Sequence, residues 1–339
     1  MTPIHADLQA TLDAVKVVSP TRYTFLGEPR DAAAVAQGPN RGPDDLGAEG
    51  GDERVDGLVD SIAVDLYERL YLRPEAAPPP LPADQFNRRD LVAALRAANS
   101  GRGTWESGWS VRRVEGDGQR IAVVRERLTF WVSPEGLRVP GGEVRAGAAC
   151  QVRVGKEMRN WVPGFYVALG DAGTDLDDPG GHAGPLIRYY WHLMPEAAAP
   201  FMKEATSVLN KAGVPFVIKV RNDPNGFRRA DAGVLFVRRW YLALLGDAVT
   251  RVHALVAAGL RHEVPLFTLR LGDGLGLAED PEGELSFGQH RCLLAARALC
   301  RSFRKGDTDT MGRAFTMAET FLQAGLDPTR PHLGPDAQC

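Results

Sequence analysis

A lysine inside an apolar segment is the residue whose setting most directly suggests chemistry. The run from Gly213 to Val220 reads GVPFVIKV, and its apolar residues predict a buried strand that contains Lys219. Burying an ammonium group without a partner is costly, and a lowered pKa or a bound anion relieves that cost. The alternative interpretation is a lysine whose stem packs in the protein while its amine reaches solvent.

A pair of arginines opens the next apolar run, from Arg228 to Phe236. If the two strands are neighbours, Arg228 and Arg229 lie close to Lys219 and can hold a phosphate through bidentate hydrogen bonds. Successive residues of a strand point to opposite faces, so only one of the two arginines is expected to reach the site. Charges from Lys219 to Arg239 sum to +4, which favours an acidic ligand. A lysine base beside phosphate-holding arginines is suited to eliminating phosphate from a phosphorylated side chain.

Composition sets wider limits on the protein. The chain has 339 residues, a net charge of −3 and a pI near 6.2, which argues against a general nucleic-acid binder. Its four cysteines are scattered without a CxxC motif or a Cys/His cluster, the pattern of reduced thiols in the cytoplasm, and give no support for a metal site. We find no secretory signal and no apolar run long enough to span a membrane, so we expect a cytoplasmic protein without a membrane segment.

The order of sequence patterns predicts an α+β fold, with a strand-rich central core and helical N- and C-terminal parts. Residues 1–26 form a helical segment, with a short helix over 4–17. Residues 27–57 are rich in Gly, Asp and Ala, and we interpret them as a disordered insertion. Residues 58–335 form the α+β domain. Within it we expect helices over 54–72, 88–98, 195–212, 240–258, 287–303 and 308–324, and strands over 109–114, 121–124, 128–132, 151–154, 164–169, 185–193, 213–220 and 228–236.

Several ordered blocks of the chain resemble the HopA-type effector family. The blocks are PGFYVALGDA (163–172), LIRYYWHL (186–193), GVPFVIKV (213–220), FRRADAGVLFV (227–237), GLGLAEDP (274–281) and SFGQHRC (286–292). Founding members of that family are type III effectors of plant-pathogenic bacteria. Actinobacterial relatives serve as the lyase of class V lanthipeptide and thioamitide biosynthesis.

The resemblance implies phosphate elimination without a metal or an organic cofactor. A separate Ser/Thr peptide kinase would phosphorylate a ribosomal precursor peptide, and the lyase would convert phosphoserine or phosphothreonine to dehydroalanine or dehydrobutyrine. The family also resembles the phosphothreonine lyases of bacterial pathogens in its active-site logic. Such a lyase needs a base for the α-proton, cations that hold phosphate, and an acid for the leaving group.

The resemblance assigns roles to several residues. Lys219 is expected to be the base. His192 lies 27 residues before Lys219 on the preceding strand, and this order resembles that of the general acid and the base in phosphothreonine lyases. A histidine that only satisfies a structural hydrogen bond at a strand end is the alternative.

Other cations could complete the phosphate site. His290 and Arg291 lie at the start of a predicted helix, where backbone N–H groups favour an anion, although Ser286 could equally be a simple helix cap. Arg188 and Lys156 are further candidates, for which a surface salt bridge is the alternative. The expected site residues are therefore Lys219, His192 and His290 for catalysis and Arg228, Arg229, Arg188, Lys156 and Arg291 for phosphate binding, with no metal.

Two further classes of function stay open. One is a non-catalytic scaffold that binds a phosphopeptide and presents it to a partner kinase. The other is a type III effector. The chain has no Walker phosphate loop, no nucleophile elbow and no HExxH motif, so it does not match kinases, α/β-hydrolases or zinc peptidases.

Overall fold

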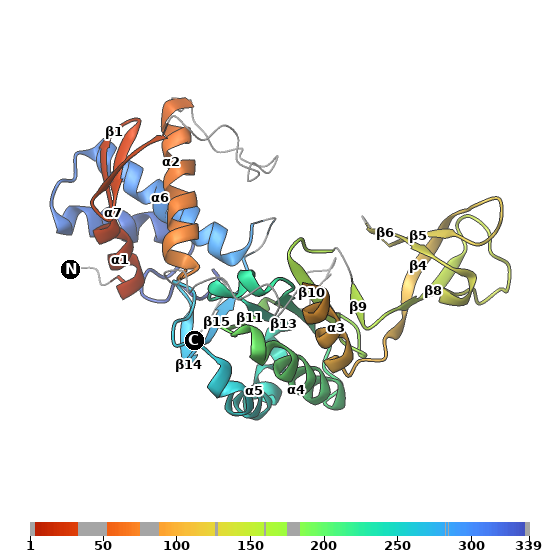
Figure 1. Ribbon diagram of the computed structural model, residues 1–339. Helices are drawn as coiled ribbons and strands as arrows, with labels where there is room; N and C mark the ends of the chain where they lie inside the picture. The colour runs from red at the N-terminus through yellow and green to blue at the C-terminus, as the bar shows by residue number, and fades with distance from the viewer. Residues whose placement is uncertain are drawn as a thin grey trace.

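The computed structural model describes residues 4–32, 53–74, 88–125, 128–158, 161–174, 184–281, 283 and 285–335. Figure 1 shows three parts: a central sheet with helices beneath it, a layer of helices built from both ends of the chain, and a projecting arm of strands. This is the α+β fold that the sequence predicts, with a strand-rich core and helices at both termini.

The central sheet has seven strands in the order β14-β15-β11-β13-β12-β10-β9, and every neighbouring pair is antiparallel. Most of its strands are rich in apolar, β-branched and aromatic residues, which favour a sheet covered on both faces. The strands are β9 Glu157–Met158, β10 Phe165–Leu169, β11 Leu186–Trp191, β12 Val217–Arg221, β13 Gly233–Arg238, β14 Leu269–Gly272 and β15 Leu275–Glu279.

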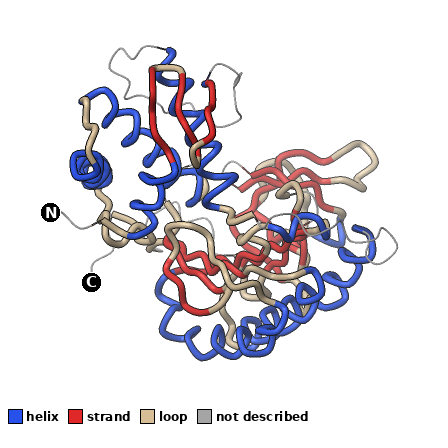
Figure 2. Tube along the Cα trace, turned by 60° about the vertical axis from the view of Figure 1, so that its left-hand side comes forward, coloured by secondary structure: helices blue, strands red, loops and turns tan. Residues whose placement is uncertain are grey.

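One face of this sheet is covered by three helices, α3 Arg88–Ala98, α4 Ala198–Lys211 and α5 Leu242–Val256. Figure 2 shows helices along this side of the strands. Each helix contributes apolar residues one turn apart, such as Phe201, Ala205 and Leu209 of α4, to a core that includes Trp191 and Ile218 of the sheet.

The opposite face meets a layer formed by both ends of the chain. Helix α2 Glu53–Asp65 continues as a π-helical turn, Leu66–Tyr71, and packs with α6 Phe287–Lys305 and α7 Thr310–Gln323. Helix α1 Ala6–Ala14 joins the same core, together with an antiparallel sheet of β1 Val15–Ser19, β2 Arg22–Phe25 and β3 Glu28–Asp31. Tyr190 and Val234 of the central sheet belong to this core as well.

The arm is a separate five-stranded antiparallel sheet in the order β6-β5-β4-β8-β7. It has its own small core around Trp109, Val123 and Val152. Its strands are β4 Thr104–Val114, β5 Ile121–Arg125, β6 Leu128–Val132, β7 Leu137–Arg138 and β8 Ala149–Val154.

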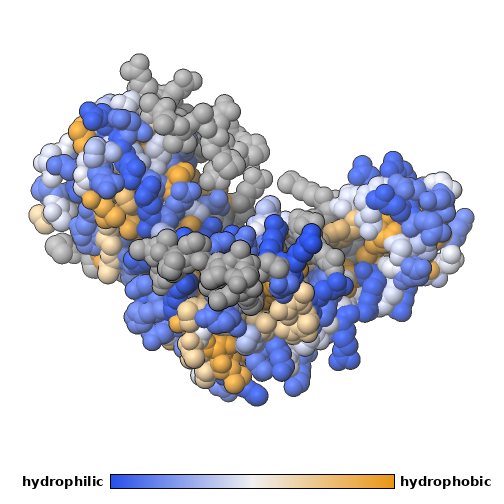
Figure 3. All heavy atoms as spheres, viewed as in Figure 1, coloured by the Kyte–Doolittle hydropathy of each residue, from blue (hydrophilic) through white to orange (hydrophobic). Residues whose placement is uncertain are grey.

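One apolar stretch corrects an expectation about membranes. Among the described residues, Arg239–Gly259, which contains α5, is long and apolar enough to cross a membrane by length and composition. Helix α5 nevertheless packs Leu245, Val249 and Val252 into the core, and a core helix passes the same test. The stretch is weak evidence for a span. Its outer face carries exposed Leu244 and Leu255, and Figure 3 shows an apolar area at the lower edge, where Figure 1 places α5.

Two further sequence expectations need correction. The predicted helix over 4–17 ends at Ala14, because Val15 already has extended backbone and begins β1. The predicted disordered insertion over 27–57 includes β3, and helix α2 begins at Glu53, so both of its ends are ordered. Residues 33–52 of that insertion lie outside the described residues.

Candidate functional site

Lys219 lies at the centre of β12, with buried Ile218 and Val220 on either side. Strand β12 runs between β10 and β13, where Lys219 is paired with Val167 and with Val234. Paired residues of an antiparallel sheet share a face, so Lys219 points away from helices α3, α4 and α5. The side chain is partly buried.

Two aromatic rings flank the Lys219 ammonium group. Nζ lies 4.9 Å from the ring centroid of Phe165 and 5.3 Å from that of Phe236. Ring faces attract a cation, but the attraction only partly replaces hydration. No hydrogen-bond or ion-pair partner of Lys219 is present among the described residues. The ammonium group is therefore held in place without a counter-ion of its own.

Arg188 approaches the same ring from the neighbouring strand. It is paired with Phe236 across β11 and β13, and its guanidinium carbon lies 5.0 Å from the Phe236 centroid. Its Nη2 is 2.6 Å from Oδ1 of Asp280, which follows β15. Both side chains are largely buried. A charged donor held this firmly by a carboxylate is oriented for a second anion on its free edge.

A second arginine–aspartate pair lies on the other side of Lys219. Arg229 donates two hydrogen bonds to Asp231, from Nε and Nη2, each 2.8 Å long, and a longer one of 3.3 Å to the Tyr67 hydroxyl. Asp231 is 5% exposed. Arg221 lies nearby, with its guanidinium carbon 4.5 Å from the Phe165 ring centroid.

This arrangement lowers the pKa of Lys219 to about 8, first through burial and then through the charge of Arg188, with Arg229 adding to the effect. Asp231 and Asp280 act in the opposite direction without cancelling it. Roughly one Lys219 side chain in ten is then neutral at pH 7, compared with a negligible fraction of ordinary lysines. Such a lysine can accept a proton near neutral pH.

The pKa values of the two neighbouring acids shift in opposite directions. Burial alone would raise the pKa of Asp231, but Arg229 lowers it, so this carboxylate stays ionised. Burial raises the pKa of Asp280 despite Arg188. Burial also raises the pKa of Tyr190 to about 12, so this phenol keeps its proton. Tyr190 is paired with Val234, which is paired with Lys219, so the phenol shares the lysine's row and face.

The structure brings together three of the site residues predicted from sequence: Lys219, Arg188 and Arg229. The placement of the arginines needs correction, because Arg228 ends a short 3₁₀ helix, Pro224–Arg228, and β13 begins only at Gly233. Neither Arg228 nor Arg229 lies on the strand, so their side chains do not alternate between its two faces.

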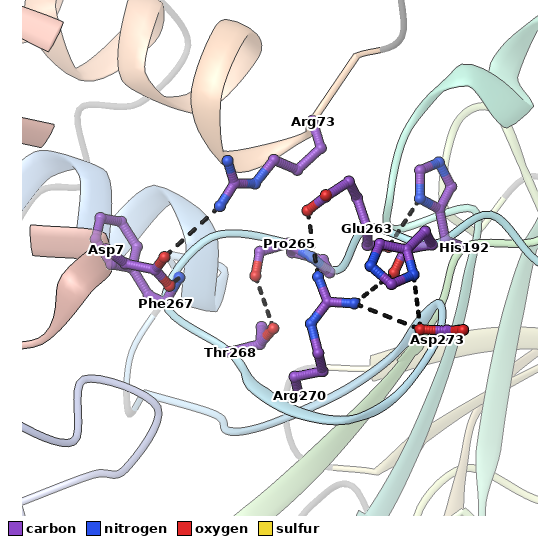
Figure 4. A network of polar contacts seen from close by, with 10 residues as sticks. Asp7, Arg73, His192, Glu263, Pro265, Phe267, Thr268, Arg270 and Asp273 are labelled. Atoms are coloured by element: carbon purple, nitrogen blue, oxygen red, sulfur yellow. Dashed lines mark hydrogen bonds and ion pairs between the residues drawn. The ribbon is translucent and has the colours of Figure 1, made fainter. Parts of the chain in front are cut away.

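His192 lies beyond the end of β11, two residues past Tyr190. Its ring is buried, and its Nδ1 lies 2.9 Å from the carbonyl oxygen of Glu263. Figure 4 shows this contact beside a cluster in which Arg270 meets Glu263 and Asp273. This is the structural hydrogen bond of the alternative interpretation, and the residue level with Lys219 on β11 is Tyr190.

The start of α6 is built as a helix cap. Ser286 and Gln289 form a reciprocal capping box, the structural alternative for this segment. Burial lowers the pKa of His290 to about 4, with Arg291 adding to the effect, so the imidazole is neutral at pH 7 and cannot act as an imidazolium acid. Arg291 is buried and donates to the carbonyl groups of Pro331 and Leu333, at 2.8 and 2.7 Å. It anchors the C-terminal segment next to the site.

The contacts of Lys156 are structural and do not support its predicted role in phosphate binding. Its Nζ donates to the carbonyl groups of Arg96 and Asn99, at 3.0 and 2.8 Å, at the C-terminal end of α3. A cation here is favoured by the unpaired carbonyls and the helix dipole. Lys156 thus ties the β8–β9 turn to α3.

Sequence reasoning missed four polar residues of this face: Asp231, Asp280, Tyr190 and Arg221. Asp231 could have been found, because it follows Arg229 by two residues, a spacing that permits a local ion pair. Asp280 could not, because its segment has the Gly-rich composition of a turn, whereas residues 275–279 form β15. In the part of the chain that the structure describes, no group of three or more His, Cys, Asp or Glu side chains is arranged to hold a metal ion.

The fold and this face together define an α+β protein that carries a cluster of cationic side chains on one side of its central sheet. The HopA1 effector protein family model matches residues 157–333, which contain all seven strands of that sheet. The chain belongs to this family.

Two solved structures are similar to the chain. The effector protein from Pseudomonas syringae pv. tomato strain DC3000 is 16% identical, with a TM-score of 0.48 over 82% of this chain and 95% of that one. The effector protein from Pseudomonas syringae pv. syringae strain 61 is 17% identical, with a TM-score of 0.48 over 83% of this chain and 93% of that one. No curated protein sequence matches the chain.

Proposed function

We propose that the Lys219 face binds a phosphorylated serine or threonine of a peptide and eliminates its phosphate. The observation that carries the proposal is the Lys219 ammonium group, held between Phe165 and Phe236 without a counter-ion and flanked by Arg188 and Arg229. Phosphate supplies the missing negative charge, and the lowered pKa supplies a base.

The reaction balances without a cofactor. Neutral Lys219 takes the α-proton of the phosphorylated residue, and the electrons of that C–H bond form the Cα=Cβ double bond. The Cβ–O bond breaks, and its electron pair leaves with the phosphate. Arg188 and Arg229 are oriented by Asp280 and Asp231 and stabilise the charge on the leaving group. Tyr190, which keeps its proton, is a candidate donor to the departing oxygen.

The biological role is a separate question from this chemistry. Membership of the HopA1 effector protein family supports a role as an effector more directly than it supports a lyase reaction. A precursor peptide phosphorylated by a separate kinase is one substrate that the site would accept, and a phosphorylated host protein is another. A scaffold that binds a phosphopeptide without turnover would use the same arginines but would not need a lysine of lowered pKa.

Mass spectrometry of phosphothreonine and phosphoserine peptides incubated with the protein tests the proposal. We expect loss of one phosphoric acid from the peptide with wild type. Because a general base contributes about 10²–10⁴-fold to a rate, Lys219→Ala should slow elimination by about that factor. Lys203→Ala, at an exposed position of α4, is the matched control and should react like wild type.

Three outcomes separate the candidates. Elimination at an unchanged rate in Lys219→Ala would exclude Lys219 as the base. Tight phosphopeptide binding without turnover, measured by anisotropy, would establish the scaffold instead. Product formation only after adding a kinase and its peptide would show that the substrate must be phosphorylated and presented by that partner.

A further inference from the structure

A cavity of about 560 Å³ lies away from the Lys219 face, at the base of the arm. It forms where the segment between α3 and β4 meets the end of β10 and the C-terminal half of α4. Seven of its eight lining residues have polar side chains, and three of those side chains are cationic. The lining residues are Ser100, Arg102, Gly103, Arg153, Asp171, Ser207, Asn210 and Lys211.

The cations of this cavity are available to a ligand. Arg102 and Lys211 are exposed and have no side-chain hydrogen bond or ion pair within the described ranges. Arg153 donates one hydrogen bond of 2.6 Å, from Nη2 to the carbonyl of Arg102, and its other donors are uncommitted among those residues. A cavity with three positive side chains attracts an anion.

The one carboxylate among the lining residues is already bonded to backbone. Oδ1 of Asp171 accepts from the N–H groups of Arg102 and Gly103, at 2.7 and 2.8 Å. The N–H of Asp171 donates to Oδ1 of Asn210, at 2.9 Å, which fixes the orientation of that amide. Nδ2 of Asn210 is buried and has no acceptor among the described residues. An incoming oxygen acceptor would satisfy this donor.

The positive surface continues from the cavity along the arm. Trp105 is paired with Arg153, and Arg138 with Gln151, two residues earlier on β8, so all four share one face of the sheet. The guanidinium carbon of Arg138 lies 3.8 Å from the Trp105 ring centroid, and that of Arg153 lies 6.0 Å from it. Figure 3 shows that much of the visible surface of the arm is hydrophilic.

We propose that this surface, from Lys211 through Arg102 and Arg153 to Arg138, binds an acidic segment of a partner polypeptide. Charge complementarity selects the ligand, and the extent of the surface over α4, a loop and two strands favours an extended chain over a small ion. Carboxylates of the segment meet the three cations of the cavity, and a backbone carbonyl or carboxylate accepts from Asn210.

The surface is distinct from the Lys219 face. Asp171 lies in the turn beyond the end of β10, whereas Val167, the partner of Lys219, is at the centre of that strand. The cavity is also lined by α4, which covers the opposite side of the sheet. Binding here therefore does not depend on the elimination reaction.

Fluorescence anisotropy with a labelled peptide of alternating Glu and Ser tests the proposal on the full chain. We expect Arg102→Gln/Arg153→Gln/Lys211→Gln to weaken binding by about tenfold or more, and added salt to weaken wild-type binding. The control Arg112→Gln/Arg145→Gln/Lys203→Gln removes three exposed cations outside this surface and should bind like wild type. Lys219→Met should also bind like wild type, whether or not the protein eliminates phosphate.

Three results would overturn the assignment. The first is equal affinity of wild type and the cavity variant, with circular dichroism showing that both are folded. The second is equal affinity for a peptide of alternating Gln and Ser. The third is displacement of the acidic peptide by an equimolar amount of inorganic phosphate, which would identify the ligand as a small oxyanion.

Discussion

The two faces of the central sheet are built from opposite kinds of residues. The face under α3, α4 and α5 is filled with apolar and aromatic side chains, among them Trp191 and Ile218. The other face carries a lysine, several arginines and two acids in the space between the sheet and the terminal helices, while still sharing Val234 with an apolar core. Apolar side chains like those of the first face stabilise a folded sheet, whereas the charged side chains of the second face are not needed for folding.

The two faces therefore contribute to stability with opposite signs. Apolar burial stabilises the covered face by roughly 25 cal/mol per Å². On the charged face, removing Lys219 from water beside Arg188 and Arg229 is unfavourable, as the lowered pKa of the lysine records. A sheet needs no such residue for folding, and a pattern of this kind concentrates at functional sites.

The largest expected change in stability comes from the covered face. Phe201 is fully buried in α4, with its ring centroid 5.0 Å from that of Trp191. Phe201→Ala should lower the free energy of unfolding by about 3–5 kcal/mol, because it removes apolar contacts and leaves a cavity. Urea denaturation followed by circular dichroism measures this. Phe315→Ala, at a position 59% exposed on α7, is the control. An equal loss of stability there would show that the effect of Phe201→Ala does not come from burial.

On the charged face, the largest expected change comes from Asp231→Asn. The substitution leaves Arg229 without its bidentate partner, beside Lys219 and Arg221, and should cost about 3 kcal/mol. Because Asp231 raises the pKa of Lys219, the variant should also lower that pKa below about 8.

Acid titration provides a second measurement of the same pair. The folded-state pKa of Asp231 is lowered, so its contribution to stability is present above the unfolded pKa near 3.9 and is lost as the pH falls through the folded value. Asp231→Asn should therefore flatten the loss of stability below pH ~4. Asp31→Asn, in an exposed pair with Arg22, is the control and should change neither the free energy of unfolding nor its dependence on pH. If Asp231→Asn lost stability with falling pH just as wild type does, the Arg229–Asp231 pair would not contribute to stability.

The sequence predicts the elements of the covered face better than those of the charged face. Helix α3 was expected over 88–98 and occupies Arg88–Ala98. The spacing of its apolar residues can be recognised from a short stretch of sequence, without knowledge of the rest of the fold. Strand β15 was missed, because Gly276 within it and Gly274 just before it allow close approach to Thr268 and to Arg261 that only the folded chain reveals.

The site was predicted only in part, because some of its features are local in sequence and others arise only from the fold. Lys219 is conspicuous, since a charge inside an apolar run is visible in the sequence alone. Its relation to Arg188 depends on the order of strands in the sheet, which brings β11 and β12 to either side of β13. His192 was expected to act with Lys219 as the general acid, whereas the register places Tyr190, two residues earlier, level with Lys219, and no sequence pattern encodes that register.

Replacing Lys219 should change the free energy of unfolding with the opposite sign to replacing Phe201. Lowering the pKa of a lysine in the folded state to about 8 means that the unfolded chain binds more protons between pH 8 and about 10.4. Stability should rise with pH through that window, and the cost of the buried cation is fully present below pH 8.

Lys219→Met should therefore be more stable than wild type at pH 7, by about 2–3 kcal/mol after allowance for the partial exposure of the lysine. The advantage should shrink at pH 9.5, where wild-type Lys219 is mostly neutral in the folded protein. Parallel urea denaturation at the two pH values measures the difference, with Lys203→Met as a control that should show no such dependence. A Lys219→Met variant less stable than wild type at pH 7 would mean that the ammonium stabilises the fold, and the contrast between the two faces would disappear.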